Sequence, residues 1–159
     1  MNRREMCSLL PAALAVNALA GSAFAAEGAS MPSVAIPFDQ LPVEKGKGAQ
    51  FRQIVKGKLA TGEEVEMHET VLDPGGAPHP PHHHPHSEFW LIREGTVEIT
   101  ISGKPHVIGA GSAAYVASNE EHGIKNAGST PAIYFVVAVG PGAVTHISPQ
   151  NENKKSNPT

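Results

Sequence analysis

A short run of histidines and prolines between Gly76 and Gly95 constrains this chain more than any other part of its sequence. The run reads GAPHPPHHHPHSEFWLIREG. His82 and His84 are two positions apart, so in an extended chain their side chains point to the same side. Glu88 lies an even number of residues further on and can join that side. Two imidazoles and a carboxylate that converge on one point are typical ligands of a divalent metal ion.

A fourth ligand is needed to close such a site, and a second segment offers His122. This segment reads GSAAYVASNEEHGIKN, and the turn residues Ser118 and Asn119 precede the histidine. The sequence therefore predicts that two separated pieces of chain fold together around one metal ion.

The two segments resemble the two sequence motifs of the cupin family. The first has the order Gly76, five residues, His82, one residue, His84, three residues, Glu88, six residues, Gly95. This spacing selects His82 and His84 as the ligand pair, although His84 and His86 are spaced in the same way.

The second segment has the order Gly111, five residues, Ala117, one residue, Asn119, two residues, His122, three residues, Asn126. Ala117 stands where the family usually has proline, and Asn119 stands where it usually has glycine. Asparagine tolerates the left-handed turn conformation that glycine would adopt, so we expect the turn to be kept.

The resemblance implies an all-β fold, an antiparallel double-sheet jelly-roll barrel. It also implies that His82, His84, Glu88 and His122 bind the metal. Glu88 is similar to a glutamate that is thought to accept a proton in dioxygenases of this class, so we assign it the catalytic role.

Composition and hydrophobic alternation support the same fold class. Sixteen glycines and fourteen prolines favour turns and short strands over long helices. The segment 96–101 alternates cleanly, with Val97, Ile99 and Ile101 expected inside. The strand 131–139 is apolar on both faces, which predicts that both faces are covered. The inward face of the strand 64–72 is predicted to carry Val65, Met67 and Val71, with Glu69 at the pocket wall and His68 in solvent.

Four further residues are candidates for the substrate pocket. Trp90 shares the face of Glu88 by alternation. Tyr115 and Tyr134 are candidate hydroxyl donors, and His86 is a candidate for proton transfer, as is Glu69. For each of these residues a packing role is the competing interpretation.

The ends of the chain are predicted to lie outside the barrel. Arg3 and Arg4 precede an uncharged apolar stretch that ends in Ala23-Phe24-Ala25, a secretory pattern with a small-residue cleavage site. We therefore expect a periplasmic or secreted protein, by the general or the twin-arginine route. The expected divisions are a signal peptide (1–25), a flexible N-terminal arm (26–48), the cupin domain (49–147) and a disordered tail (148–159).

The expected function is a metalloenzyme that acts on a small oxygen-rich organic molecule. The cofactor is one divalent transition metal, with Fe or Mn favoured over Zn, Ni or Cu if the ion is acquired inside the cell. The first candidate reaction is dioxygenase cleavage, like that of the quercetin dioxygenases. Isomerase or lyase chemistry is the next candidate. The family resemblance favours a homodimer. The net charge of −3 and the lack of a basic block argue against nucleic-acid binding, and signal cleavage would leave no membrane segment.

Other interpretations stay open at this point. The histidine run is also typical of a disordered metal-chelating tract. A cupin barrel can be structural only, or it can be a module that binds a metal or a sugar without turnover. A metal-storage role would use His79, His83 and His86 and would bind more than one ion per chain.

Overall fold

The computed structural model describes residues 30–46 and 48–145. The expected signal peptide (1–25) and the expected C-terminal tail (148–159) lie outside the described residues. Within the described part, the chain forms one short 3₁₀ helix and nine strands. These elements are η1 (Phe38–Gln40), β1 (Val43–Gly46), β2 (Ala49–Lys58), β3 (Glu64–Leu72), β4 (Ser87–Glu94), β5 (Thr96–Ile101), β6 (Lys104–Gly109), β7 (Ala113–Val116), β8 (His122–Asn126) and β9 (Ala132–Val139).

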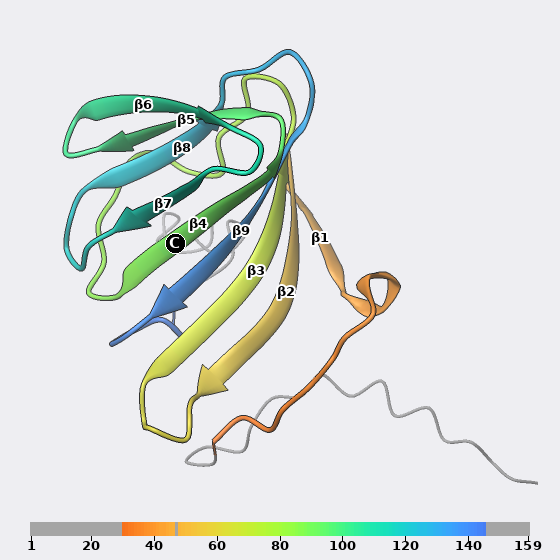
Figure 1. Ribbon diagram of the computed structural model, residues 1–159, viewed down its shortest axis with the longest axis vertical. Coiled ribbons are helices and arrows are strands. Elements are labelled where there is room, and N and C mark those ends of the chain that lie inside the picture. The colour runs from red at the N-terminus through yellow and green to blue at the C-terminus, as the bar shows by residue number, and fades with distance from the viewer. Residues whose placement is uncertain (1–29, 47, 146–159) are drawn as a thin grey trace, which may run out of the picture.

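The strands form two antiparallel sheets that share one core (Figure 1). The larger sheet has the order β1-β2-β3-β9-β4-β7, and the smaller sheet has the order β6-β5-β8. Buried residues of both sheets pack in a single hydrophobic cluster, with Val97 and Ile99 from the smaller sheet and Trp90 and Tyr134 from the larger one. The predicted antiparallel double-sheet barrel of the cupin type is confirmed. In the described residues, no helix is long and apolar enough to cross a membrane.

The hairpin of β5 and β6 has the geometry that its sequence predicts. Val97 and Ile99 are 0% and 1% exposed, as the alternation in this segment requires. Ser102 and Gly103 connect the strands with φ angles of 48° and 75°. Two consecutive residues with positive φ match the right-handed twist of a hairpin, and a glycine adopts this conformation at little cost.

The strand β3 faces the opposite way from the prediction. Leu72 and Thr70 are buried, and Thr70 pairs with the core residue Tyr134 of β9. Because alternate residues of a strand share a face, the even-numbered side of β3 is the inner side. The outer face carries the residues predicted to point inward, which are Val65, Met67 and Val71. Both sides of this strand contain apolar residues, so the sequence pattern alone does not determine which side faces the core. The pairing with β9 places the even-numbered side there.

Glu69 is consequently on the outer face and is not part of a pocket wall. Its side chain is 1% exposed and contacts Arg52 and Arg93 at 3.3 and 3.0 Å. The ring of Phe38 covers the guanidinium group of Arg52, 4.8 Å from the ring centroid. Two cations therefore compensate this buried carboxylate, which removes it from the set of proton-transfer candidates.

The predicted solvent position of His68 is also wrong. His68 is on the inner side of β3, and its Nδ1 atom lies 2.8 Å from Oε2 of Glu66. The amide of Gln53 donates to the same carboxylate at 2.6 Å, and the ring of Phe51 lies 4.4 Å from the imidazole. An acidic side chain and a histidine thus satisfy each other inside the barrel.

The strand β9 lies between β3 and β4 in the larger sheet. Ala132, Tyr134, Val136 and Ala138 are buried on its inner side. The alternate positions are half-buried, so the outer side of this apolar strand is only partly covered by the described residues. The inner positions place Ala138 next to Glu88, where the candidate site begins.

Candidate metal centre

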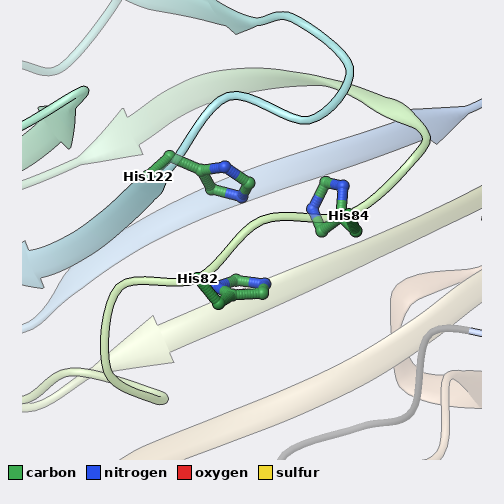
Figure 2. Close-up of side chains that lie close together, drawn as sticks. All are labelled: His82, His84 and His122. Carbon is green, nitrogen blue, oxygen red and sulfur yellow. The ribbon is translucent and has the colours of Figure 1, made fainter.

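A pair of backbone hydrogen bonds brings the two histidine segments together. The N–H of His82 donates to the carbonyl of His122 at 2.9 Å, and the N–H of His122 donates to the carbonyl of His82 at 2.8 Å. Side chains of a directly paired antiparallel bridge lie on the same side. The two imidazole centroids are accordingly 4.7 Å apart (Figure 2).

Gly123 keeps this bridge close. A Cβ atom on Gly123 would lie 3.1 Å from the ring of Pro81, which precedes His82. This distance is shorter than most van der Waals contacts of a Cβ atom. The absence of a side chain at Gly123 therefore lets the segment with His82 approach the beginning of β8.

The ends of the two motifs hold the barrel together instead of lining the site. The N–H of Asn126 donates to the carbonyl of Gly76 at 2.9 Å. The side-chain amide of Asn126, which is buried, donates to the carbonyls of Leu72 and Thr130 at 2.9 and 2.8 Å. A Cβ atom on Gly76 would lie 2.8 Å from the carbonyl oxygen of Gly48, so only glycine fits there.

Asn119 has the left-handed conformation that the sequence analysis expected. Its φ angle is 62°, which asparagine tolerates better than most residues. Its N–H donates to the carbonyl of His84 at 2.8 Å. The turn before His122 is therefore attached to a residue of the first segment.

Three imidazoles surround a common space (Figure 2). The ring of His84 lies 5.2 Å from that of His82 and 4.6 Å from that of His122, measured between centroids. One nitrogen of each ring lies within 4.8 Å of the other two. The ring planes cross at 51° to 69°, so their nitrogen lone pairs can point at one position.

Glu88 completes this cluster from β4. Its Oε1 lies 3.2 Å from Nε2 of His84, and its Oε2 lies 3.5 Å from Nε2 of His122. The side chain of Trp90 donates its Nε1–H to Oε2 at 2.8 Å, so the carboxylate has a fixed orientation. Glu88 is 5% exposed. A buried carboxylate with two imidazole nitrogens beside it is a suitable donor set for a metal ion.

The Nδ1 atoms of His84 and His122 lie beside backbone carbonyl oxygens, and this determines the tautomer of each ring. Nδ1 of His84 lies 3.0 Å from the carbonyl oxygen of His86, and Nδ1 of His122 lies 2.7 Å from that of Glu120. A carbonyl only accepts, so in each ring Nδ1–H donates, and Nε2 presents a lone pair when the ring is neutral. Metal-binding histidines are typically oriented in this way.

In the absence of metal, the neighbouring groups shift the pKa values of Glu88 and His122 in opposite directions. Burial alone would raise the pKa of Glu88, but hydrogen bonds from His122, His84 and His86 lower it far below its usual value. Burial lowers the pKa of His122, but Glu88 and the carbonyl of Glu120 outweigh burial and raise it. Glu88 is therefore a carboxylate throughout the neutral range, and a proton on His122 competes with a metal ion for Nε2 as the pH falls.

The predicted pocket residues divide into two groups. Trp90 and His86 are 3% and 1% exposed and lie beside Glu88, with Nε2 of His86 3.7 Å from Oε1. Tyr134 is also inside the barrel, where burial raises the pKa of its hydroxyl and keeps it protonated. Tyr115 is not brought to the cluster. It is 54% exposed on the outer face of β7, and its ring lies 5.1 Å from that of Phe89.

The pair formed by Glu66 and His68 was not predicted from the sequence. The pairing register places Glu66 and Glu88 on opposite sides of Ala138, all on the inner face. Two strand spacings separate their backbones, which is about 10 Å. Glu66 and His68 are each an even number of residues from the buried Leu72, so all three share one face of the strand. This spacing could have predicted an acid–base pair on the inner face.

Three other histidines are not part of the group of imidazoles around the common space. His83 is exposed, as expected for the residue between two inward neighbours. His79 is half-buried, and its ring stands edge-on to that of His82 at 4.2 Å. His106 is exposed on β6.

The fold and the histidine–glutamate cluster define a β-barrel of the cupin class with a site able to hold a metal ion. Residues 68–138 match the family of cupin domains. Together with the structural neighbours described below, this match supports the cupin superfamily.

Two curated relatives are similar over parts of their length. The chain is 34% identical to the dimethylsulfoniopropionate lyase DddW of Ruegeria pomeroyi over 96 residues, which is 58% of this chain and 63% of the lyase. It is 31% identical to the mannose-1-phosphate guanylyltransferase of Klebsiella pneumoniae over 61 residues, which is 38% of this chain and 13% of that protein. The chain thus spans less than two thirds of either relative.

Solved structures share the fold at low sequence identity. An RmlC-like cupin from Shewanella frigidimarina has a TM-score of 0.56 at 22% identity, over 65% of this chain and 87% of that one. The polyketide cyclase RemF from Streptomyces resistomycificus has a TM-score of 0.58 at 18% identity, over 68% of this chain and 80% of that one. These neighbours establish the barrel and not a reaction.

Proposed function

We propose that this protein is a metalloenzyme that binds one divalent transition metal with His82, His84, Glu88 and His122. The observation that carries the proposal is the convergence of Nε2 of His84 and Nε2 of His122 on the two oxygens of Glu88. Both imidazoles have Nδ1 engaged by a carbonyl, which leaves Nε2 for the ion. The donor set contains nitrogen and oxygen only, which suits Fe, Mn, Zn, Ni or Cu.

The reaction that we favour is elimination of a leaving group from a small carboxylic acid. Its support is the 34% identity to a dimethylsulfoniopropionate lyase, whose named substrate is a small carboxylic acid with a leaving group. A bound metal ion supplies Lewis-acid polarisation of a carboxylate or carbonyl oxygen. For this reason we rank lyase chemistry ahead of the dioxygenase cleavage that the family resemblance alone suggested.

In such an elimination, a base takes a proton from the carbon next to the carboxylate. The electrons of that C–H bond form a double bond, and the bond to the leaving group breaks with its electron pair. His68, oriented by Glu66, and His86 are the inward-facing candidates for the base. Glu88 is the less suitable base, because its lowered pKa makes it a weak proton acceptor. Trp90 keeps Glu88 in place through its hydrogen bond.

Product formation with and without oxygen tests this assignment. Protein loaded separately with Fe, Mn, Zn or Ni is incubated with acids that carry a leaving group, including dimethylsulfoniopropionate, and with diketones and flavonols. The lyase proposal predicts an unsaturated acid under anaerobic conditions. His84→Ala should abolish its formation, whereas the exposed His83→Ala should retain it.

Three other outcomes would contradict the lyase assignment. Turnover that requires oxygen uptake would identify a dioxygenase. Conversion of a substrate into its isomer without a leaving group would identify an isomerase. Saturable binding of a metal or a sugar without any product would identify a binding module.

The identity of the metal is a separate proposal. We propose Fe or Mn, because a protein that folds before export would take its ion from the cell interior. Elemental analysis of the protein purified from its native host tests this. Cu or Zn in the protein, with neither Fe nor Mn, would refute it.

We further propose that the protein is exported by residues 1–25 and forms a homodimer. Phe89, Leu91 and Tyr115 are large apolar side chains on one outer face of β4 and β7, and each is about half exposed. A second copy of the chain is an occupant that would cover them. Sequencing of the mature N-terminus and light scattering of Phe89→Lys beside wild type test the two claims. An uncleaved N-terminus refutes the first, and a wild-type monomer refutes the second.

A further inference from the structure

An acid–base pair lies on the inner face of β3, outside the histidine–glutamate cluster. Nδ1 of His68 lies 3.0 and 2.8 Å from the two oxygens of Glu66. The side chain of Glu66 is 4% exposed, and that of His68 is 12% exposed. Apolar side chains at two such positions would avoid the cost of burying charged groups. A buried pair of this kind on the inner face therefore points to a chemical role.

A β-bulge holds the carboxylate of Glu66 in place. The pairing of β2 with β3 shifts its register between Gln53 and Val55. The amide nitrogen of Gln53 lies 2.6 Å from Oε1 of Glu66, and 3.0 Å from the carbonyl oxygens of Val55 and Met67. Bulges are frequent beside active sites, where they redirect a side chain. Here the bulge directs Gln53 to Glu66, and Glu66 orients His68.

Glu66 also determines which nitrogen of His68 can take a proton. A carboxylate only accepts hydrogen bonds, so Nδ1 of His68 carries a hydrogen and donates it. Nε2 then has the lone pair when the ring is neutral. The two residues thus have the arrangement of a general base oriented by a carboxylate, which also stabilises the ring once it has taken a proton.

The strand registers place His68 across the inner face from the metal-binding cluster (Figure 1). The strand β9 lies between β3 and β4, and its Val136 pairs with His68 on one side and with Trp90 on the other. Trp90 in turn donates to Glu88. Because the sheet curves around the core, side chains on the inner faces of β3 and β4 converge. A small acid held at the cluster can therefore extend toward Nε2 of His68.

His86 is less suited to the role of base. It is 1% exposed, and its ring stacks on that of His84 with a centroid distance of 3.5 Å and an interplanar angle of 11°. Behind it, a Cβ atom on Gly140 would lie 3.6 Å from Cα of His86. A general base must contact the substrate and afterwards release its proton. The closely covered ring of His86 is shielded from both, whereas the ring of His68 is partly open.

We infer that His68 is the general base of the proposed elimination and that Glu66 and Gln53 are its positioning residues. This inference rests on the proposed lyase function and deepens it by choosing between the two inward histidines. Nε2 of His68 takes the proton from the carbon next to the carboxylate. The electron pair of that C–H bond forms the double bond, and the leaving group departs with its own bonding pair. The proton then passes from His68 to water.

Kinetics of the metal-loaded protein test the base, with dimethylsulfoniopropionate as the first probe among acids that carry a leaving group. His68→Gln should lower kcat about 10²- to 10⁴-fold, the usual contribution of a general base, with an unchanged Kd for Zn²⁺. Imidazole added to His68→Ala should restore part of kcat, which a purely structural role would not allow. His106→Gln changes an exposed histidine on β6 and should retain the wild-type kcat.

NMR of ¹⁵N-labelled, zinc-loaded protein tests the positioning residues without turnover. The neutral ring of His68 should carry its hydrogen on Nδ1 in the wild type. In Glu66→Gln the new amide can donate to Nδ1, so the ring should shift toward the tautomer with the hydrogen on Nε2, and kcat should fall about 10-fold or more. Gln53→Met should have the same two effects to a smaller extent. Circular dichroism establishes that each variant is folded.

The outcomes separate this inference from the proposed function. If the wild type forms the unsaturated acid and His68→Gln keeps its kcat, only this inference fails. A neutral His68 with its hydrogen on Nε2 in the wild type would also overturn it, and this measurement does not depend on the folding of any variant. Loss of Zn²⁺ from His68→Gln together with kcat would make His68 part of the metal site instead. A metal-loaded wild type that forms no unsaturated acid refutes the proposed reaction and this inference together.

Discussion

His82 and His122 exchange both of their backbone hydrogen bonds, at 2.9 and 2.8 Å, although they come from different segments of the chain. This bridge places two imidazoles on one side before any metal is present. The cluster is therefore preorganised by the fold, and ion binding should add to the stability of the folded state instead of creating it.

Loss of one of the bridged imidazoles should remove the stabilisation by metal. His82→Ala or His122→Ala is expected to lower the thermal midpoint of the metal-loaded protein to that of the metal-free protein. A ligand at a hundred times its Kd contributes about 2.7 kcal/mol, so the shift should be several degrees. His83→Ala is the matched control and should keep the full shift. Metal-dependent stabilisation that persists in both ligand variants would argue against the assignment.

Metal affinity should decrease as the pH decreases. The pKa of His122 is raised in the folded protein, so its proton competes with the ion over a range that extends above pH 6.5. Below the folded pKa, Kd should rise about tenfold per pH unit for one displaced proton. Titrations at pH 8, 7 and 6 that follow the fluorescence of Trp90 measure this, since it is the only tryptophan. An unchanged Kd over this range would contradict the prediction.

The same shifts affect the metal-free protein. The raised pKa of His122 contributes stability that is fully present below the unfolded value and is lost as the pH rises through the folded value. The lowered pKa of Glu88 contributes stability above its unfolded value, which is lost as the pH falls through the folded one. Urea unfolding of wild type and His122→Ala without metal, at pH 6 and pH 9, checks the first effect. The stability difference between the two proteins should be smaller at pH 9.

Trp90→Phe should weaken both the barrel and the metal site. The substitution removes the hydrogen bond of 2.8 Å to Oε2 of Glu88, and a bond to a charged group is worth about 1.5–3 kcal/mol. Without this hydrogen bond the carboxylate of Glu88 is less firmly oriented. Metal affinity should therefore decrease about 10- to 100-fold, as is typical when a hydrogen bond that orients a metal ligand is lost. Circular dichroism and a competing chelator measure the two effects. Tyr115→Phe, on the exposed outer face, should change neither.

Asn126→Ala should destabilise the protein without a change in ligand chemistry. The side chain of Asn126 donates to two carbonyls and accepts the N–H of Gly128 at 2.8 Å, and the residue itself is 2% exposed. Leaving such groups without a partner costs about 1–3 kcal/mol. Asn119→Gly is the contrasting substitution, because a residue with a φ of 62° accepts glycine. Equal stability of the two variants would show that the role of Asn126 is misassigned.

The sequence predicted the parts of the fold that depend on local patterns. The alternation in β5 predicted the burial of Val97 and Ile99, and the turn preference of asparagine predicted the conformation of Asn119. The spacing of His82 and His84, together with Glu88, predicted which side chains would gather.

The parts that depend on long-range pairing were not predictable in the same way. The orientation of β3 followed from its register with β9, and this register moved Glu69 to the outer face and His68 inside. Glu69 is satisfied there by Arg52 and Arg93, which are remote in sequence, so no local pattern could indicate its burial. Tyr115 was assigned to the pocket from its residue type alone, and the pairing of β7 with β4 placed it outside.

The most direct test of the metal centre is an anomalous-difference map from crystals of the protein loaded with one equivalent of a transition metal. We expect density among His82, His84, Glu88 and His122, with nitrogen and oxygen ligands at about 2.0–2.2 Å if the ion is zinc. Density only at His79 or His83, or no density inside the barrel, would contradict the claim that these residues form a metal centre.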